Sequence, residues 1–328
     1  MIYTHSSWYY SKEINFEFLG FPSRYFIYKV LIFIILCILI SISNGFSQGC
    51  SDAGVCKIGS LKPDSDYNMI QHDNKLDAGI SVGAADYGIT VFGGHLGYSR
   101  QFGENWSVDT KVTFLSQSGN EVSVIGAGDI FANVNYKISQ KLTLTGGVKV
   151  PLMKADRDED GKPLPMDYQS SLGTFDLLAG ARYQTEKWQW ALAVQIPLQQ
   201  NDNAFFPGGF PAGSMINDIQ ATNAFQRQTD IMLHVSRNIW MSDKITFTPG
   251  LLPIYHVGED EYTGIDGIQY AIDGSDGLTL NGTIFINVDA GSSGNFEFDL
   301  GFPFIVRDAR PDGLTRSFVF GVNYSYGF

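Results

Sequence analysis

Three things are scarce in this chain of 328 residues: cysteine, basic side chains, and long apolar runs after about residue 48. A helix that crosses a membrane needs about 20 apolar residues, so any span after residue 48 must be made of strands. Lys and Arg number 22 against 34 Asp and Glu, and this acidic balance argues against nucleic acid as a partner. No Gly-rich phosphate loop, Cys/His metal cluster or nucleotide motif stands out, so the sequence predicts neither an enzyme nor a cofactor.

The one long apolar run lies near the start of the chain. Residues 30–42 follow Arg24 and Lys29 and lead into a small, polar exit at 43–48. This order of basic flank, apolar core and small-residue exit predicts a secretory signal peptide over residues 1–48. Without it, 19 Lys and Arg remain against 32 Asp and Glu.

Only Cys50 and Cys56 remain after the signal peptide, since Cys37 lies within it. In an oxidising compartment this pair predicts a small disulfide loop, with lipidation of Cys50 as an alternative. The segment 49–74 is too short for a domain. It either hangs in the periplasm or folds into the following domain as a small plug, and the ordered loop favours the plug.

The end of the chain alternates strictly between large apolar and small or polar residues. From Ser317 to Phe328 one face carries Phe318, Phe320, Val322, Tyr324, Tyr326 and Phe328. Such period-two alternation is typical of a strand that is wet on one side and apolar on the other. A terminal strand of this kind ending in Phe resembles the insertion signal of bacterial outer-membrane β-barrels. The resemblance implies that the barrel-assembly machinery reads Tyr324, Tyr326 and Phe328.

The same alternation recurs through residues 75–328, in about twelve segments of membrane-spanning length. The connections alternate between short ones, as at 103–105 and 185–187, and long ones at 153–172, 201–224 and 259–276. Trp106, Trp188, Trp190 and Trp240 all lie beside short turns, as an aromatic girdle at one membrane boundary requires. These features favour a transmembrane antiparallel β-barrel of about twelve strands in the outer membrane over a soluble β-sandwich.

Alternation also predicts which charged side chains face the lumen. These are Asp77, His95, Asp109, Lys111, Asp129, Lys137, Lys149, Asp176, Arg182, Asp230, His234, Glu297 and Asp299. We expect most of them to pair across strands as struts of the wall. The acidic excess favours cations or neutral solutes.

Two sequence features suggest chemistry. Asp156, Asp158, Asp160 and Asp167 are spaced as in a calcium loop, which predicts either a weak Ca²⁺ site in an extracellular loop or a solvated acidic loop. His234, Ser236 and Asp230 share a face, but four strand residues separate Asp230 from His234, about 13 Å, too far for a hydrogen bond. We therefore predict no catalytic residues.

Two further features concern the wall and the mouth. Pro197, Pro249, Pro253 and Pro303 should interrupt their strands, either harmlessly or as a lateral opening for an apolar solute. The apolar segment 205–211 either folds into the mouth as a constriction or packs on neighbouring loops.

Two stretches resemble known families. Residues 126–130, Gly-Ala-Gly-Asp-Ile, running into Asn135-Tyr136-Lys137-Ile138, resemble a strand of the outer-membrane phenol meta-pathway degradation transporters, a family related to the long-chain fatty-acid channels. Residues 49–56, Gly-Cys-Ser-Asp-Ala-Gly-Val-Cys, resemble the start of a group of Bacteroidetes outer-membrane proteins.

The first resemblance implies uptake of small, hydrophobic or aromatic solutes. Together these features predict a porin-like barrel, embedded in outer-membrane lipid, for passive transport of a small-molecule solute. The alternative is a non-transporting barrel with an adhesive or scaffolding role through its long loops.

Overall fold

The computed structural model describes residues 61–62, 72–291, 293–313 and 317–328. The predicted signal peptide, the cleavage site, Cys50 and Cys56 lie outside these residues. Long strands, each antiparallel to its neighbours, form one sheet in the order β10-β9-β8-β5-β4-β3-β2-β1-β17-β16-β15-β12-β11. A further pairing of β10 with β12 closes this sheet into a barrel.

The strands of the barrel are β1 (Asn74–Ala84), β2 (Thr90–Phe102), β3 (Trp106–Gly119), β4 (Val122–Lys137), β5 (Leu142–Pro151), β8 (Phe175–Gln184), β9 (Trp188–Gln199), β10 (Asp230–Arg237), β11 (Ile239–Ser242), β12 (Ile245–His256), β15 (Gly277–Asp289), β16 (Gly294–Ile305) and β17 (Phe318–Gly327). The loops contain the hairpins β6 (Asp158–Glu159) with β7 (Lys162–Pro163) and β13 (Glu261–Thr263) with β14 (Gln269–Ala271). They also contain the 3-10 turns η4 (Asp86–Gly88), η5 (Met166–Tyr168) and η6 (Met215–Asp218).

The barrel has twelve strands, because β10 and β11 are consecutive parts of one barrel strand that both pair with β12. The first and last strands are neighbours: β1 pairs with β17 from Lys75 opposite Gly327 to Ala84 opposite Phe318. The prediction of an all-β antiparallel barrel of about twelve strands is therefore confirmed.

The outer surface of the barrel is apolar. Large hydrophobic side chains stand exposed on every long strand, among them Ile80, Leu96, Leu192, Leu251 and Phe320. Among the described residues, no helix is both long and apolar enough to cross a membrane. An even number of antiparallel strands with an apolar exterior is the form of outer-membrane barrels, and the protein resides in the outer membrane.

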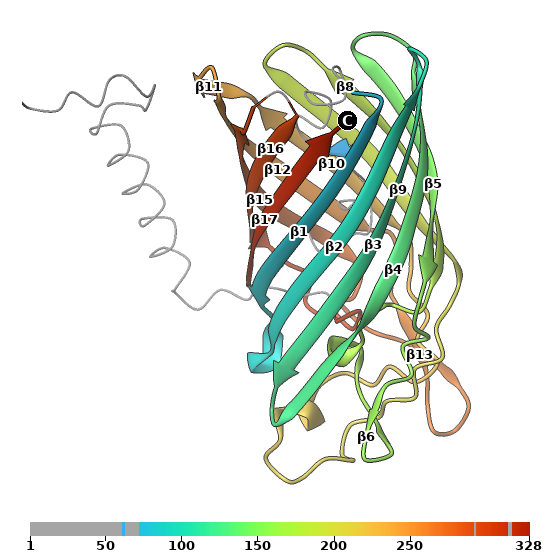
Figure 1. Cartoon of the computed structure of the whole chain (residues 1–328). Coiled ribbons are helices and arrows are strands. Elements are labelled where there is room, and N and C mark those ends of the chain that lie inside the picture. The colour runs from blue at the N-terminus through green and yellow to red at the C-terminus, as the bar shows by residue number, and fades with distance from the viewer. Residues whose placement is uncertain (1–60, 63–71, 292, 314–316) are drawn as a thin grey trace, which may run out of the picture.

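The two ends of the barrel differ (Figure 1). Short turns join the strands at the end that carries the C-terminus, and the long connections gather at the opposite end. Trp106 and Trp188 begin strands at the short-turn end, and Trp240 lies just before the turn to β12. Their rings contact neighbouring aromatics: Trp106 lies 4.6 Å from Tyr136, and Trp188 lies 6.1 Å from Trp190. This is the arrangement that an aromatic girdle at one membrane boundary has.

A β-bulge reverses the alternation of β4. Val112 pairs with Ile130 but Phe114 pairs with Ala127, so Gly128 and Asp129 together oppose a single residue of β3. One extra residue moves the side chains that follow to the opposite face. Between the bulge and the β3–β4 turn, Val122 and Val124 point inward, and Ile125 points out to the membrane side.

The four strand prolines coincide with irregularities in the sheet. Pro197 and Pro303 each lie at a register shift, in β8–β9 and in β15–β16. Pro253 and Pro249 fall where β12 loses its partners on β10 and β11, while its ladder with β15 continues. A proline has no backbone N–H to donate, so the ladder is broken on one side only.

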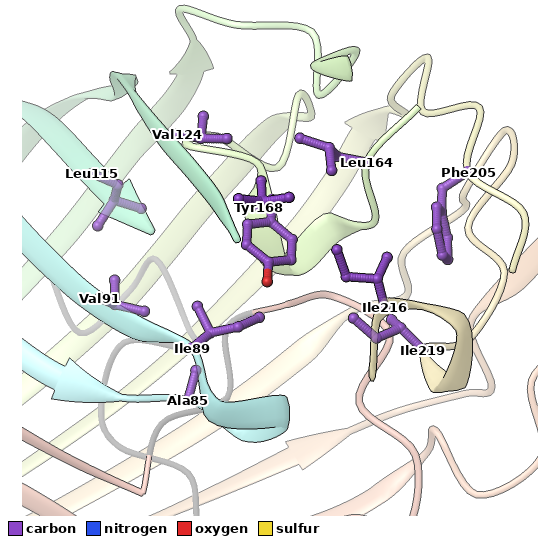
Figure 2. Close-up of a cluster of buried hydrophobic side chains, with 11 residues drawn as sticks. Ala85, Ile89, Val91, Leu115, Val124, Leu164, Tyr168, Phe205, Ile216 and Ile219 are labelled. Atoms are coloured by element: carbon purple, nitrogen blue, oxygen red, sulfur yellow. The ribbon is translucent and has the colours of Figure 1, made fainter. Parts of the chain in front are cut away.

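The long connections fold over the mouth of the barrel and bury an apolar core there (Figure 2). The core joins inward residues of β2, β3 and β4 to loop residues, and its members are Ala85, Ile89, Val91, Leu115, Val122, Val124, Leu164, Tyr168, Phe205, Ile216 and Ile219. Phe205 is fully buried and lies 6.4 Å from the ring of Phe210. The segment 205–211 thus packs on neighbouring loops. We call the β1–β2, β5–β8 and β9–β10 connections, which contribute to this core, the loop cap.

Candidate functional site: the barrel lumen

The lumen holds the charged side chains that the alternation predicts to face inward. Those buried in the interior are Asp109, Lys111, Asp129, Lys149, Asp176, Arg182, Asp230 and His234; Asp77, His95, Lys137, Glu297 and Asp299 are partly buried. No predicted lumen residue points to the lipid side of its strand. The functional question is therefore which of these groups serve the wall and which face open space.

Several of these side chains are engaged by neighbours in the wall. Lys149 pairs with Asp176 at 2.8 Å and donates to Thr174 at 2.8 Å. Asp109 accepts hydrogen bonds from the amides of Asn133 at 2.7 Å and Asn135 at 2.9 Å. A buried charge is tolerated only when it is paired or hydrogen-bonded, so these groups act as struts between strands.

Glycines allow many inward polar side chains to lie flat along the wall. Asp77 is the cross-strand partner of Gly97, and Asp299 is the partner of Gly321. A Cβ at either glycine would overlap the facing carboxylate. Asn323 lies in the same way across Gly79. Because these side chains run along the wall instead of across the barrel, space remains in the lumen.

That space is a cavity of about 140 Å³. The side chains and glycines that line it belong to β1, β2, β3, β15, β16 and β17 and to the N-terminal segment; those with an inward-facing position include Ser81, Gly93, His95, Lys111, Thr113, Leu115, Thr283, Phe285, Asp299, Gly301, Gly321 and Asn323, together with Lys62. His95 pairs with Asp77 at 3.2 Å, and Lys62 pairs with Glu297 at 3.1 Å. Lys62, Lys111 and Asp299 line the cavity, so it presents both signs of charge.

The opposite side of the lumen contains an apolar cluster. Phe131, Leu178, Met232, Leu252 and Ile254 form a buried cluster with two alanines of β9. Leu61, from the N-terminal segment, packs into this cluster and is 3% exposed. With Lys62 on the cavity side, residues 61–62 bridge the two halves of the barrel interior.

At the mouth, six buried ionisable groups form one network. His256 lies between two carboxylates, with Nδ1 2.6 Å from Asp230 and Nε2 2.8 Å from Asp260. An ionised carboxylate only accepts hydrogen bonds, so this position between two carboxylates suits the imidazolium form of His256, in which both ring nitrogens donate.

Two arginines complete this network. Arg227 pairs with Asp230 and lies 3.5 Å from Asp312, which also pairs with Arg307 at 3.1 Å. Burial opposes ionisation of Asp312, but Arg307 and Arg227 outweigh it and hold the pKa of Asp312 below its usual range. Three cations and three anions balance, and they tie three long connections to the ends of β10 and β12. We call this set the mouth network.

The sequence analysis missed most of the mouth network, naming Asp230 alone. Asp260 and Asp312 lie in the connections, where no period marks a side chain as inward. Arg227 and Arg307 lie near the ends of the predicted segments 226–238 and 294–307, but outside the observed strands β10 and β16. A signal did exist for His256, because a hairpin register counted outward from the turn at residue 243 makes it the partner of Asp230.

His234, Ser236 and Asp230 do not hydrogen-bond to one another in the structure. The Nε2 of His234 lies 3.0 Å from the hydroxyl of Thr283, on the far side of β12. Asp230 is held by Arg227 and His256. The hydroxyl of Ser236 has no hydrogen-bond partner among the described residues.

The acidic loop does not gather its four carboxylates. Asp158 accepts a hydrogen bond from the backbone of Gly161 at 2.9 Å in an exposed hairpin, whereas Asp167 is buried in the loop cap. Within the described part of the chain, no three His, Cys, Asp or Glu side chains come together in a way that could hold a metal. The geometry therefore gives the predicted Ca²⁺ site no support.

Burial has a strong effect on Asp167. Removal from water raises its pKa to about 7, and the nearby carboxylates of Asp86 and Asp312 add to the rise while Arg310 opposes it. Residue 313 is a glycine with φ of +65°, and a Cβ there would overlap the backbone of Met166 and Asp167. The β5–β8 and β16–β17 connections thus touch at Asp167.

No protein-family model matches the chain, and no curated protein matches it. Among solved structures it is similar to the NanC porin, at 8% identity and a TM-score of 0.44 over 78% of this chain and 100% of that one. It is also similar to the CymD monoaromatic hydrocarbon channel, at 10% identity and a TM-score of 0.45 over 86% and 97% of the two chains. A third, the toluene transporter TbuX of Ralstonia pickettii, has 9% identity and a TM-score of 0.44 over 84% and 94%. Likeness at this level identifies no solute.

Proposed function

We propose that this barrel is a passive outer-membrane channel for a small solute. The observation that carries the proposal is the cavity of about 140 Å³ within the lumen, lined by charged and hydroxyl groups. An apolar cavity of roughly 150 Å³ in another protein holds a benzene molecule, so this space suits a solute of similar bulk. A wall built only for stability would fill this space with side chains.

The lining also favours a solute with an apolar or aromatic body. Phe285 and Leu115 lie in it beside the polar groups, and both are almost fully buried. Apolar surface of the solute would leave water there, at roughly 25 cal/mol per Å². The polar groups would fix the orientation of the solute, as in most small-molecule sites.

Transport would then be diffusion down a gradient in three stages. The solute meets the loop cap, which must loosen to admit it; it then rests in the cavity and leaves past the N-terminal segment. The mouth network and the packed core of the loop cap supply the closed state. No step consumes energy.

Filling the cavity tests this proposal. Phe285→Trp adds bulk inside the lumen, and Phe320→Trp adds the same bulk on the lipid-facing surface of β17 as the matched control. In proteoliposomes we expect at least a tenfold loss of small-solute flux for Phe285→Trp and none for Phe320→Trp, with both barrels resisting SDS unless heated. Equal flux through the wild type and Phe285→Trp would overturn the proposed path.

The exposed tip of the β13–β14 hairpin favours a second candidate, an adhesive or scaffolding barrel. Ile265 is 91% exposed and Ile268 is 56% exposed, which is unusual for isoleucine in water. If this role is correct, Ile265→Asp with Ile268→Asp abolishes binding of cells to a surface while no solute passes through the wild-type protein. Flux through the wild type would favour the channel.

A further inference from the structure

A row of aromatic rings lies on the outer wall of β8 and β9, at the short-turn end of the barrel (Figure 1). The ring of Tyr183 lies 5.8 Å from that of Trp190, and Trp190 stacks on Trp188 at 6.1 Å. All three rings face outward, because the neighbouring residues Arg182 and Gln189 are buried in the interior. Tryptophan and tyrosine prefer the boundary between the apolar layer of a membrane and its headgroups. The row therefore marks the level of the lipid headgroups.

Arg237, the last residue of β10, extends this row on the next strand. It is the cross-strand partner of Trp188, and its guanidinium carbon lies 5.5 Å from the centre of the Trp188 ring. Its side chain is exposed on the lipid-facing side, whereas the preceding residue, Ser236, is buried in the interior. An arginine on this side of a barrel is tolerated near the boundary, where its charged end reaches the headgroups.

Arg237 lacks the anionic partner that buried cations of this protein have. Lys149, Arg227 and Arg307 each pair with a carboxylate. Within the part of the chain that the structure describes, no carboxylate pairs with Arg237. Contact with the face of the Trp188 ring uses none of the five N–H donors of the guanidinium. These donors can therefore bind an anion that comes from outside the chain.

The neighbouring turn fixes the position of Trp188. The hydroxyl of Thr185 accepts a hydrogen bond from the backbone N–H of Trp188 at 3.0 Å. The backbone N–H of Asn238 donates to the carbonyl of Lys187 at 2.8 Å, which ties the end of β10 to the same turn. The ring of Trp188 thus offers the guanidinium a preformed support, and preorganisation of this kind reduces the cost of binding.

The surroundings of Arg237 match a phospholipid in charge and in polarity. The anion at the headgroup level of a membrane is the lipid phosphate, and the planar fork of an arginine fits phosphate oxygens in pairs. Toward the middle of the membrane the wall continues with Leu192 and Leu233, which are cross-strand partners and exposed. The acyl chains of the same lipid can lie against these apolar side chains.

We propose that Arg237 and Trp188 form a binding site on the outer wall for the phosphate group of one membrane phospholipid. Arg237 donates hydrogen bonds to the phosphate oxygens, and Trp188 positions the guanidinium. The acyl chains lie along Leu192 and Leu233. The site is outside the lumen, so it does not depend on the channel function.

Three lipids with identical dioleoyl chains test the role of the phosphate: phosphatidylglycerol, phosphatidylethanolamine and diacylglycerol. Both phospholipids carry the phosphodiester, whereas diacylglycerol has the same acyl chains and only a hydroxyl. Binding to the full-length protein in detergent is measured by native mass spectrometry over a titration of each lipid. We expect each phospholipid to bind as one tight copy, at least tenfold more tightly than diacylglycerol.

Variants separate the guanidinium from its support. Arg237→Gln should weaken both phospholipids at least tenfold without changing the affinity for diacylglycerol. Arg237→Lys keeps the charge without the planar fork, so we expect an intermediate affinity. Trp188→Leu should weaken both phospholipids several-fold, because the guanidinium loses the ring that positions it. Lys244→Gln, in the exposed turn between β11 and β12, loses one positive charge at the same end of the barrel and should bind as the wild type does.

All variants should still migrate on gels as heat-modifiable barrels, which shows that they are folded. Equal affinity for diacylglycerol and the phospholipids would overturn the site, because packing of the acyl chains would then account for binding. Wild-type affinity of Arg237→Gln for both phospholipids would overturn it as well. So would an equal loss in Lys244→Gln, because that loss would reflect general attraction by positive charge at this end of the barrel.

Discussion

Single residues decide how much of the lumen is empty. An inward Asp or Asn in this barrel stands opposite a glycine on the neighbouring strand at Asp77, Asp299, Asn323 and Asn133. The sequence contains these glycines, and the alternation predicts the inward acids. The alternation does not give the register between neighbouring strands. Only this register shows that each glycine faces an acid or an amide.

Asp167 is the loop-cap residue whose raised pKa gives a testable pH dependence. Its pKa of about 7 in the closed loop cap exceeds that of an exposed Asp, about 3.9, so the closed cap binds an additional proton between these values. Linkage then makes the closed cap most stable in acid, progressively less stable as pH rises from about 4 to 7, and constant above that.

We therefore expect protease to cleave the 152–174 connection several-fold faster at pH 8 than at pH 5, with the barrel intact at both. Asp167→Asn cannot ionise, so this variant should be protected at pH 8 as the wild type is at pH 5. The exposed Asp202→Asn, in the neighbouring connection, is the control and should keep the wild-type profile. A pH dependence unchanged by Asp167→Asn would assign it to other groups of the loop cap.

At the scale of elements, the alternation was sufficient for the strands and insufficient for the connections. At most strand ends the predicted segments agree with the twelve barrel strands to within a few residues, because each strand has one face in lipid and one in the lumen. The exception is the tip of the β3–β4 hairpin, which continues to Asn120 and Glu121. There the bulge at Gly128 and Asp129 reverses the phase, and the apolar row Val122, Val124 and Ile125 gives no sign of which face is inward.

The same bulge explains what the Gly-Ala-Gly-Asp-Ile stretch does in this protein. The hydroxyl of Ser171 donates to Asp129 at 2.6 Å, and that of Ser170 donates to the carbonyl of Ala127 at 2.7 Å. A Cβ on Gly128 would crowd Thr113 and the backbone of Ser170. The stretch is therefore the place where the β5–β8 connection docks on the inner wall.

The connections are held by the mouth network, and one substitution should release them. Asp312→Asn leaves Arg227 and Arg307 with unbalanced charge, and removal of one partner from a buried pair costs about 3–5 kcal/mol. We expect faster protease cleavage in the 200–229 and 306–317 connections. The double variant Arg307→Met with Asp312→Leu removes one charge of each sign and should be less affected than Asp312→Asn alone.

Glu159→Gln is the control for Asp312→Asn. It also removes one negative charge from the long connections, but Glu159 is exposed in β6. Equal cleavage of Asp312→Asn and the wild type would show that the packed core of the loop cap holds the connections without the mouth network.

The outward-facing row of the last strand, β17, and the terminal Phe328 give a test of the expected assembly signal. Tyr324, Tyr326 and Phe328 stand exposed in one row on the outer surface, and Tyr326 stacks on Phe328 at 6.3 Å. Deletion of Phe328 removes the end of this row, two backbone hydrogen bonds with Asn74 and a third from the side-chain amide of Asn74. If the row is the assembly signal, the truncated chain should accumulate in the periplasm without heat-modifiability. Phe328→Tyr keeps an aromatic end and should insert normally, while normal insertion of the deletion would reject the signal.

At the scale of the whole molecule, the loop cap folds over one end of the barrel, and residues 61–62 lie inside the lumen. Leu61 lies in the apolar cluster of β4, β8, β9, β10 and β12, and Lys62 reaches Glu297 on β16. Residues 61–62 therefore bind opposite walls of the barrel at once. The sequence predicted a plug from the cysteine spacing, and these two contacts are the physical reason to keep that proposal.

Deletion of residues 49–71 should raise single-channel conductance, because it removes Leu61 and Lys62 from the lumen while β1 still begins at Asn74. A chain of full length with Leu61→Ser and Lys62→Ser tests the contacts themselves. It loses the apolar anchor and the ion pair with Glu297, so its conductance should fluctuate between the wild-type level and that of the deletion. Leu76→Ser, on the outer face of β1, makes the same kind of change outside the lumen and should conduct as the wild type does. Wild-type conductance in the deletion would show that the segment does not obstruct the path, and the loop cap would then be the sole barrier to the solute.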